Sequence, residues 1–387
     1  MQCCIILKVG YSFGMKENPF LFGRIVYEKE FCPRREQIEE LRSYVSGGQS
    51  VVVLGERRVG KTSLVNEAVR GMKGYGLVDC DFWAVKSLQD VAERIMNAIV
   101  SMQVRDRTLW EKMRKTVSGL RPTLEMDPMT GQTGVSIAPA KELRPESFDG
   151  VFDLIAEIAK ERPIAVAFDE FQDVSAVKES EALLGRMRGR IQRQKGVAYI
   201  FTGSIRHGMD AIFREHKSPF FKSVNFVEVG PLPEDEFFKY LGNRFRRGKR
   251  KFSRASFQRV GELALDNPND IQQFCSALWY GTQEGDEIGE EEIAEGLERL
   301  LATEKKNCEV QYKLVTGLQQ RVLKALARVG GEHPQSKDFL MESKVATPAS
   351  VKGAFNRLVN LEYVYGPETD FKFFDPWFRQ WLIHRAP

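Results

Sequence analysis

Short apolar runs alternate with segments of helical periodicity through the first 230 residues of the chain. Residues 51–54 and 164–168 are apolar throughout and have the length of buried strands. We expect strands at residues 50–54, 77–80, 164–168 and 197–202, with helices at residues 61–70, 88–102, 148–160 and 179–194. Strands that alternate with helices indicate a parallel sheet that is covered by helices on both faces.

A weaker pattern interrupts this alternation between residues 121 and 140. Proline, glycine and threonine surround the alternating side chains of Thr123, Leu124, Val135 and Ile137 there. Such alternation is typical of a β-hairpin. We therefore expect a hairpin at about residues 118–145, inserted at the edge of the sheet domain.

The pattern changes after Gly230 and Pro231. Helical spacing then predicts a small all-helical domain with no strand, through helices at residues 234–247, 254–265, 268–280 and 290–301. A polar link is expected near residues 304–309. Three short helices should follow at residues 318–329, 336–342 and 348–361, and then a hairpin through residues 363–374. This order of elements matches a winged helix-turn-helix.

These patterns predict four parts of the chain. They are an N-terminal extension at residues 1–17, an α/β core at 18–229, an all-helical domain at 230–305 and a winged helix-turn-helix at 306–387. Met15, which Lys-Glu-Asn-Pro follows, is expected to be a more natural start than Met1. Residues 1–14 lack the charged start and the cleavage site of a signal peptide.

Composition narrows the class of protein. A chain of 387 residues is too long for one compact core, so two or three domains are expected. No run of 18 apolar residues occurs, and we expect no membrane span. The six cysteines lack the paired spacing of a zinc site, which favours a reducing cytoplasm. The net charge of +4 neither requires nor excludes nucleic acid as a partner.

The strongest chemical signal is the phosphate loop, residues 55–62, which reads G-E-R-R-V-G-K-T between a predicted strand and a predicted helix. Its glycines let successive backbone N–H groups point at a phosphate, and the helix N-terminus adds positive potential. Lys61 would reach the β- and γ-phosphates, and the Thr62 hydroxyl would hold Mg²⁺. The alternative is an ordinary turn between a strand and a helix. The predicted ATP-binding residues are Gly55, Glu56, Arg57, Arg58, Val59, Gly60, Lys61, Thr62 and Ser63.

Two further strand ends supply candidate catalytic groups. The apolar run 164–168 leads into Asp169 and Glu170. We expect Asp169 to hold Mg²⁺ through a water and Glu170 to act as the general base toward the attacking water. The strand at residues 197–202 leads to Ser204, which we nominate as the polar residue near the γ-phosphate, with Thr202 as the weaker choice. The alternative for Ser204 is a cap of the following turn.

Together these motifs resemble those of the AAA+ superfamily, and more narrowly the archaeal-type ATPases of the STAND group, which are related to origin-recognition ATPases. The resemblance spans residues 18–381. It implies a helical lid at residues 230–305, adenine contacts by Arg35 and Pro231, and ATP hydrolysis in a nucleotide-dependent switch. Asp266 departs from the family's Gly-Asn-Pro lid motif, and no lid arginine is evident. The segments that carry the resemblance, besides the phosphate loop, are Asn18-Pro19-Phe20, Arg35-Glu36, Pro231 and Asp375-Pro376.

Related ATPases often complete the site with an arginine from a neighbouring subunit. Arg206 and Arg214 are candidates by position, and a solvated surface arginine is the alternative for each. The densest basic cluster is Arg244, Arg246, Arg247, Lys249, Arg250 and Lys251. It is either a patch for DNA or an acidic partner, or a solvated helix end. The predicted recognition helix should bury Val351, Phe355 and Leu358 and expose Ser350, Lys352, Asn356 and Arg357.

Two functional hypotheses follow. In the first, the chain is a nucleotide-driven switch whose winged helix docks on the ATPase core, on another copy or on a protein partner. In the second, it is a DNA-binding ATPase similar to origin-recognition factors. The recognition helix exposes only two basic residues, which is few for a DNA-binding helix and favours the first hypothesis. The 244–251 cluster supports the second. A small-molecule kinase is a third class, which the expected lid and winged helix disfavour.

Overall fold

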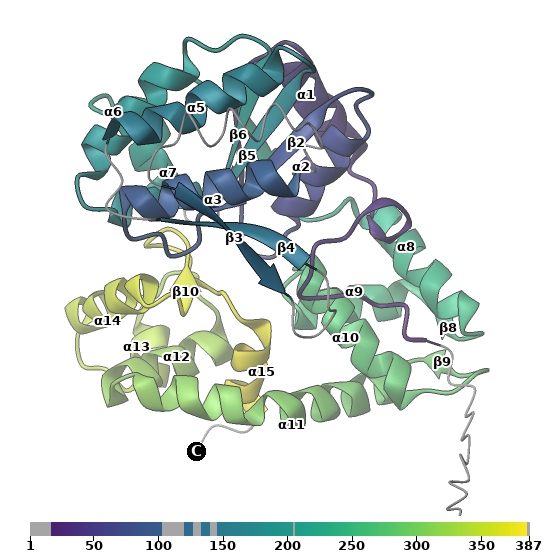
Figure 1. Ribbon diagram of the computed structural model, residues 1–387. Helices are drawn as coiled ribbons and strands as arrows, with labels where there is room; N and C mark the ends of the chain where they lie inside the picture. Colours follow the sequence, from purple (N-terminus) through teal and green to yellow (C-terminus); the bar gives the residue numbers. More distant parts are fainter. Residues whose placement is uncertain (1–16, 103–119, 127–132, 140–144, 204–205, 385–387) are drawn as a thin grey trace, which may run out of the picture. The chain divides into compact units, whose positions relative to one another are not determined.

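The computed structural model describes residues 17–102, 120–126, 133–139, 145–203 and 206–384. These divide into two compact units (Figure 1). The sheet unit comprises residues 23–236, and the C-terminal unit comprises residues 17–22 together with 237–384. The C-terminal unit therefore contains most of the expected lid and all of the described part of the expected winged helix. Within the described residues, no helix is long and apolar enough to cross a membrane.

A five-stranded parallel sheet forms the centre of the sheet unit, in the order β2-β5-β6-β1-β7. All residues of β1 and β6 are buried, as expected for strands that helices cover on both sides. The strands are β1 (Val51–Gly55), β2 (Gly76–Asp81), β5 (Ile164–Asp169), β6 (Val197–Gly203) and β7 (Asn225–Val229).

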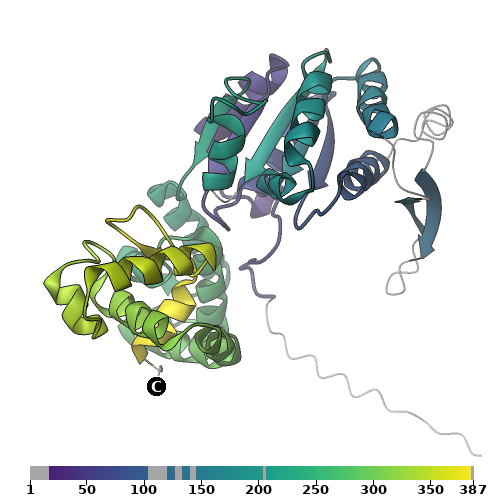
Figure 2. The ribbon, with the colours of Figure 1, turned by 90° about the vertical axis from the view of Figure 1, so that its left-hand side faces the viewer.

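Successive side chains of each strand enter different cores. Val51 and Val53 pack on one face, whereas Val52 and Leu54 pack on the other. Figure 2 shows helices on both sides of the sheet. The first face carries α1 (Arg35–Ser46) and α2 (Lys61–Arg70). The second carries α3 (Leu88–Ser101), α5 (Pro145–Ala159), α6 (Ser180–Ile191), α7 (Arg206–Phe213) and the 3-10 helix η2 (Phe171–Ala176). The α/β core predicted from the apolar runs is confirmed.

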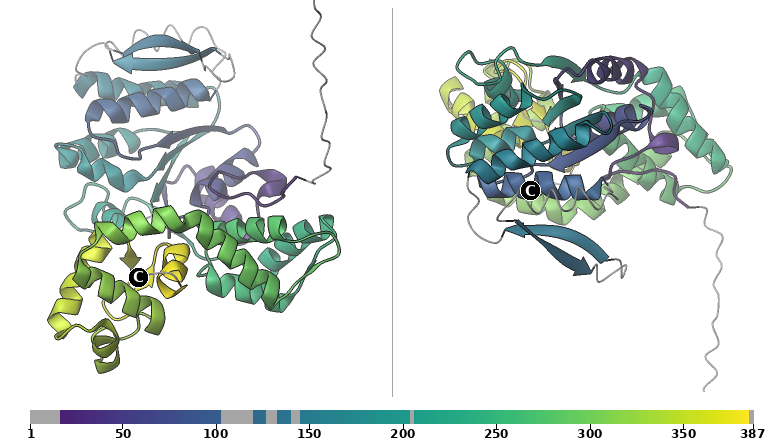
Figure 3. Two further views of the ribbon diagram at one scale, coloured as in Figure 1. Left: turned by 90° about the horizontal axis from the view of Figure 1, so that it is seen from below. Right: turned by 45° about the horizontal axis from the view of Figure 1, so that its top comes forward.

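An antiparallel hairpin interrupts the alternation between α3 and α5. It consists of β3 (Leu120–Met126) and β4 (Thr133–Pro139), paired along their length. The hairpin lies within residues 118–145, where the sequence predicts one, and β4 runs beside α3 (Figure 3).

The C-terminal unit begins with helices α8 (Glu234–Arg247), α9 (Arg254–Leu263), α10 (Pro268–Gly281) and α11 (Glu290–Leu314). The expectation that no strand separates these helices is wrong, because β8 (Lys251–Phe252) pairs in parallel with β9 (Glu287–Ile288). Strands of two residues are too short to show a periodicity in sequence. Helix α9 ends two residues earlier than predicted, since Leu265 and Asp266 adopt positive φ.

The N-terminal described residues also belong to this unit. Phe20 is buried, and its ring centroid lies 4.5 Å from that of Phe245 in α8. The Asn18 side-chain amide donates to the Ser276 hydroxyl in α10 at 2.9 Å. These contacts anchor the segment on the helices that it precedes by more than 200 residues.

The predicted polar link at residues 304–309 does not exist, because α11 runs through it. Glutamate and lysine are strong helix formers, so a polar stretch can continue a helix whose exposed face it covers. Lys305 pairs with Glu309 one turn later at 3.9 Å, and Cys308 faces the core. The polar residues at 304–309 therefore lie on the exposed side of α11 and do not mark its end.

The remaining elements form the predicted winged helix-turn-helix. Val351, Phe355 and Leu358 are fully buried, and the Phe355 ring stacks on Phe371 at 4.1 Å between centroids. Thr347 caps its helix by accepting from the Ser350 N–H, as predicted. The elements are α12 (Gly317–Val329), α13 (Lys337–Ser343), α14 (Pro348–Asn360), β10 (Val364–Tyr365), β11 (Lys372–Phe373) and α15 (Pro376–His384).

Candidate functional site

The sequence-predicted phosphate loop and acidic pair meet at the carboxyl edge of the sheet. In register, Leu54 of β1 lies opposite Gly203 of β6, and Phe168 of β5 lies opposite Phe201 of β6. The three strands therefore end side by side. Ligands of open parallel sheets bind at this edge.

The loop's glycines are required by its geometry. A Cβ on Gly55 would lie 2.5 Å from the Val229 carbonyl oxygen, so a side chain cannot fit there. Gly60 adopts a φ of +94°, which L side chains rarely reach, and it immediately precedes α2. Arg58 also adopts positive φ, at 63°. These conformations bend the chain sharply between β1 and the first turn of α2.

Lys61 is folded back onto the loop. Its side chain is only 6% exposed, and Nζ donates to the carbonyl oxygens of Gly55 (3.1 Å) and Glu56 (2.9 Å). Burial lowers the pKa of the Lys61 ammonium, while the nearby carboxylates of Glu170 and Asp169 oppose this shift. The site thus holds a partly desolvated cation beside two carboxylates.

Asp169 joins the loop to the neighbouring strands. Thr62 Oγ1 donates to Asp169 Oδ2 at 2.5 Å, and Thr202 Oγ1 donates to Asp169 Oδ1. The Glu170 N–H also donates to Oδ1, at 3.1 Å. Three segments separated by more than 30 residues in sequence are therefore tied to one carboxylate. Thr202, the weaker of the two candidates on β6, is the one that the structure brings to Asp169.

Glu170 is held by a residue that the sequence reasoning missed. It adopts a φ of 49° as the chain turns into η2, and Gln172 Nε2 donates to its Oε2 at 2.5 Å. Gln172 is only 6% exposed, and the same amide donates to Asp173 Oδ1 at 3.3 Å. The turn after β5 could have suggested a polar neighbour for Glu170, but no spacing rule identifies Gln172.

Asn66 supports the loop from α2. Its Nδ2 donates to the Thr62 carbonyl oxygen at 3.0 Å and to Asp79 Oδ2 at 2.9 Å. Ser63, predicted to contact nucleotide, is buried, and its hydroxyl accepts from the Val26 N–H at 3.1 Å. The first turn of α2 is thereby linked to β2 and to the segment before α1.

A buried arginine fixes the loop from the other side. Arg34 is 1% exposed and donates to the carbonyl oxygens of Val59 (2.9 Å) and Pro231 (3.1 Å). Burial lowers its pKa to about 10. The sequence pointed to its neighbour Arg35, which is exposed at the start of α1. The contact of Arg35 with adenine stays a prediction, while Arg34 brings the Pro231 carbonyl to the loop.

Comparison with known proteins identifies this arrangement at the level of fold. A solved structure, the Walker-type ATPase of Pyrococcus abyssi, is similar with a TM-score of 0.66 and 17% identity, over 94% of this chain and 99% of that chain. The family model described as a probable winged helix domain matches residues 309–384. The chain therefore has the fold of a Walker-type ATPase with a C-terminal winged helix.

Two structures from Aeropyrum pernix are similar at lower scores. The ORC1 protein in complex with DNA has a TM-score of 0.47 and 12% identity, over 92% of this chain and 93% of that chain. The ORC2 protein, in its ADPNP-ADP complexes, has a TM-score of 0.48 and 13% identity, over 92% and 94%. The search of curated proteins gave no match.

The other predicted site residues are placed only in part. Ser204 lies outside the described residues, as does the side chain of Arg206, at the first position of α7. Arg214 forms an ion pair with Asp210 at 3.3 Å and lies over the Phe226 ring at 4.7 Å. The role of an arginine finger stays a prediction for both arginines.

The basic cluster at residues 244–251 is not a uniform exposed patch. Arg244 is 4% exposed, donates to the Pro19 carbonyl oxygen at 3.1 Å and stacks on Tyr240. Arg250 lies over Trp279 at 4.0 Å and donates to the Thr282 carbonyl oxygen at 2.6 Å. Lys249 and Lys251 form ion pairs with Glu284 and Glu287. The packing of the helices therefore gives these basic side chains partners within the fold, which the sequence alone does not reveal.

The outward face of α14 is as predicted, since Ser350, Lys352, Asn356 and Arg357 are all exposed. Lys352, however, forms an ion pair with Glu368 at 2.7 Å. The wing therefore supplies a carboxylate that neutralises one of the two cations of this helix.

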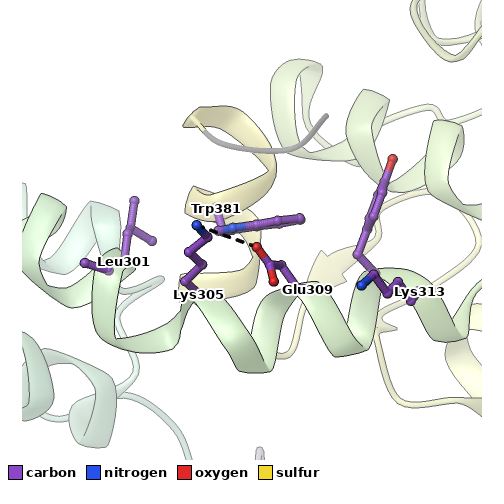
Figure 4. Close-up of a pocket in the computed structure, with 7 residues that line it drawn as sticks. Leu301, Lys305, Glu309, Lys313 and Trp381 are labelled. Carbon is purple, nitrogen blue, oxygen red and sulfur yellow. Dashed lines mark ion pairs between the residues drawn. The ribbon is translucent and has the colours of Figure 1, made fainter.

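A groove of about 620 Å³ lies between α11 and α15 in the C-terminal unit (Figure 4). Tyr312 and Trp381 form aromatic walls, and Lys305 and Lys313 stand along α11. The lining residues include no glycine loop and no strand-end carboxylate. We therefore assign the nucleotide chemistry to the sheet edge and not to this groove.

Proposed function

We propose that the chain binds Mg-ATP on the loop at residues 55–62 and hydrolyses it to ADP and phosphate, acting as a nucleotide-dependent switch. The hydrogen bond between Thr62 and Asp169 carries the proposal, because it joins the loop to the carboxylates that follow β5. A structural turn between a strand and a helix has no need of this contact. The fold, which is that of a Walker-type ATPase, supports the same conclusion.

Lys61 is the group that we propose to bind the β- and γ-phosphates. Its Nζ now donates to two neutral carbonyl oxygens. Phosphate oxygens would replace these with charge-assisted hydrogen bonds, which are about twice as strong. The N-terminus of α2 and the backbone N–H groups of residues 56–62 add further donors.

The oxygen donors of Thr62 and Asp169 fit a magnesium ion, which prefers hard oxygen ligands. Among the described residues, no group of three or more His, Cys, Asp or Glu side chains gathers as a metal site. Magnesium commonly uses one or two protein ligands together with substrate phosphates and waters, which suits this pair. When bound, the ion would neutralise charge on the phosphate oxygens.

Glu170 is the proposed general base. A carboxylate next to Asp169 at the sheet edge can accept a proton from a water that attacks the γ-phosphate. In the structure its Oε2 accepts from Gln172 Nε2, which occupies one of the lone pairs that could accept this proton. Thr202, tied to Asp169, keeps that carboxylate oriented while Glu170 acts.

Calorimetric titration with Mg-ADP and Mg-ATP tests the binding step. We expect the wild type to bind both and Lys61→Ala to bind neither within the measurable range. Lys73→Ala is the matched control, because Lys73 is an exposed lysine beyond the end of α2. Equal affinities for the wild type and Lys61→Ala would remove the nucleotide site from the account.

The winged helix is the part that we propose to dock on a partner or on another copy of the chain, in the manner of STAND-type switches. The neutralisation of Lys352 by Glu368 and the internal use of Arg244 and Arg250 support a protein partner over DNA. The four described cysteines are buried thiols outside any disulfide, which supports a reducing compartment, the cytoplasm.

DNA binding is the second candidate function, and the exposed face of α14 is the observation that favours it. Duplex binding can be measured by fluorescence anisotropy at several salt concentrations, for the wild type and for the double variant Lys352→Gln, Arg357→Gln. A DNA-binding face predicts that the double variant lowers the salt slope by roughly two phosphate contacts. Equal and weak binding by both proteins would favour the protein partner.

A further inference from the structure

A second polar cavity lies at the amino edge of the sheet, at the opposite end of the strands from the phosphate loop. Its volume is about 350 Å³. Ser50, which precedes β1, and Tyr199, near the start of β6, line it together with Arg188 and Gln192 at the end of α6. Cavities of this size accommodate small ligands.

Arg188 is the unusual member of this lining. Its Nε and Nη1 atoms are buried, and no described residue accepts a hydrogen bond from either. The two neighbouring arginines of the same helix differ. Arg186 and Arg190 both pair with Asp149 of α5, at 3.1 and 2.7 Å. Because residues two apart on a helix point to different sides, α5 carboxylates serve those two and leave Arg188 without one.

Among the residues that the structure describes, none compensates the charge of Arg188. Burial alone lowers its pKa, and no carboxylate acts against that shift. The C-terminus of α6 favours a cation in its last turn but offers no acceptor to Nε or Nη1. Two buried guanidinium nitrogens without acceptors are costly, so a group that supplies acceptors from solution would be bound there.

The rest of the lining suits an anion. Ser50 and Gln192 can donate through a hydroxyl and an amide, and the lining residues include no aspartate or glutamate. The Tyr199 hydroxyl is fixed as a donor to Gln194 Oε1 at 2.5 Å, and burial keeps its pKa well above the usual value. Among the described residues that line this cavity, no negative charge therefore competes for the guanidinium.

We propose that this cavity binds a small oxyanion, a carboxylate or a phosphate group, whose oxygens accept hydrogen bonds from Arg188. The site is separate from the proposed nucleotide site, since β6 carries Tyr199 near its start and Thr202 close to its end. Carboxylate and phosphate share the acceptor chemistry that Arg188 lacks, and the probes below distinguish them.

Thermal unfolding of the full chain tests the proposal, with sodium malonate and sodium phosphate as probes and sodium chloride at equal ionic strength as reference. We expect either probe to raise the Tm of the wild type by several degrees above the chloride reference. Arg188→Gln should abolish the shift, and Arg193→Gln, at an exposed arginine, should retain it. The shift should also persist in Lys61→Ala, which excludes phosphate bound at the phosphate loop.

A second variant tests the same idea from the opposite direction. Gln192→Glu places a carboxylate one turn after Arg188, at the spacing that permits an internal ion pair. It should fold with a Tm equal to or above that of the wild type and lose the response to both probes. A response to malonate alone assigns a carboxylate ligand, and a response to phosphate alone assigns a phosphate. No wild-type response to either probe, or an equal response in Arg188→Gln, would overturn the proposal.

Discussion

At the scale of single residues, the candidate site is a set of charged side chains, each of which is held by hydrogen bonds to neutral groups. Hydroxyls of Thr62 and Thr202 hold Asp169, and the Gln172 amide holds Glu170. Lys61 is held by carbonyl oxygens and partly desolvated. Such preorganisation, which costs stability at functional sites, leads to three predictions.

The first concerns the restraint on Glu170. Gln172→Leu keeps the buried volume but removes the hydrogen bond from Nε2 to Glu170 Oε2, so that this oxygen can accept the proton of the attacking water in its place. We expect basal ATP turnover to rise several-fold, while the affinity for Mg-ADP stays the same. Steady-state phosphate release and calorimetry measure the two quantities. A fall in turnover would show instead that Gln172 orients Glu170 productively.

The second concerns the pH dependence of Lys61. Because its folded pKa lies below the unfolded value of 10.5, the folded state releases this proton first as the pH rises. Wild-type stability should therefore increase, relative to Lys61→Met, between the lowered pKa and pH 10.5. Urea unfolding at a series of pH values, compared for the two proteins, measures the difference. A constant difference across this range would mean that burial does not perturb Lys61.

The third concerns the two adjacent arginines before and at the start of α1. Arg34→Met removes charge-assisted hydrogen bonds to the Val59 and Pro231 carbonyl oxygens, each worth about 1.5–3 kcal/mol. We expect the free energy of unfolding to fall by about 2–4 kcal/mol. Arg35→Met is the matched control, and an exposed residue should change stability by no more than about 0.5 kcal/mol. Equal effects of the two substitutions would contradict the structural role of Arg34.

These residues also show what a sequence can predict of a site. Lys61, Thr62 and Asp169 follow from short motifs whose spacing the chemistry itself requires. Arg34 and Gln172 do not, because their partners depend on how the chain turns after β5 and β7. Where two arginines are adjacent, only the packing of α1 decides which one is buried.

At the scale of elements, the apolar patterns predicted β1, β2, β5 and β6 within one residue at each end. They did not predict β7, where only Val227 and Val229 are buried. The prediction of a link at residues 304–309 was wrong, because the exposed residues of a helix such as α11 are as polar as those of a linker. The two-residue strands β8 and β9 were missed because they carry no periodicity.

The continuity of α11 gives a fourth prediction. Lys306 is exposed in the middle of this helix, within the stretch that polarity marks as a link. Lys306→Pro should lower the free energy of unfolding by about 3 kcal/mol relative to Lys306→Ala, because proline removes a hydrogen bond and clashes with the preceding turn. Chemical denaturation of both variants measures the difference. A negligible difference would indicate a link in place of the helix.

At the scale of the whole molecule, the chain combines a P-loop sheet unit with a C-terminal unit that ends in a winged helix. The fold class was predictable because both units have distinct orders of elements. The partner was not predictable, because Arg244, Arg250 and Lys352 take part in contacts that only the fold reveals. The function of the whole molecule therefore depends first on whether the candidate site at the carboxyl edge of the sheet hydrolyses nucleotide.

The most direct test of the account compares ATP hydrolysis with ATP binding in the wild type and in Glu170→Gln, in the presence of Mg²⁺. We predict that Glu170→Gln binds Mg-ATP with the affinity of the wild type, while its turnover falls by about 10²–10⁴-fold, the contribution typical of a general base. Glu179→Gln, outside the site, controls for the loss of a carboxylate. Turnover that is unchanged in Glu170→Gln, or a wild type that binds no nucleotide, would contradict the central claim.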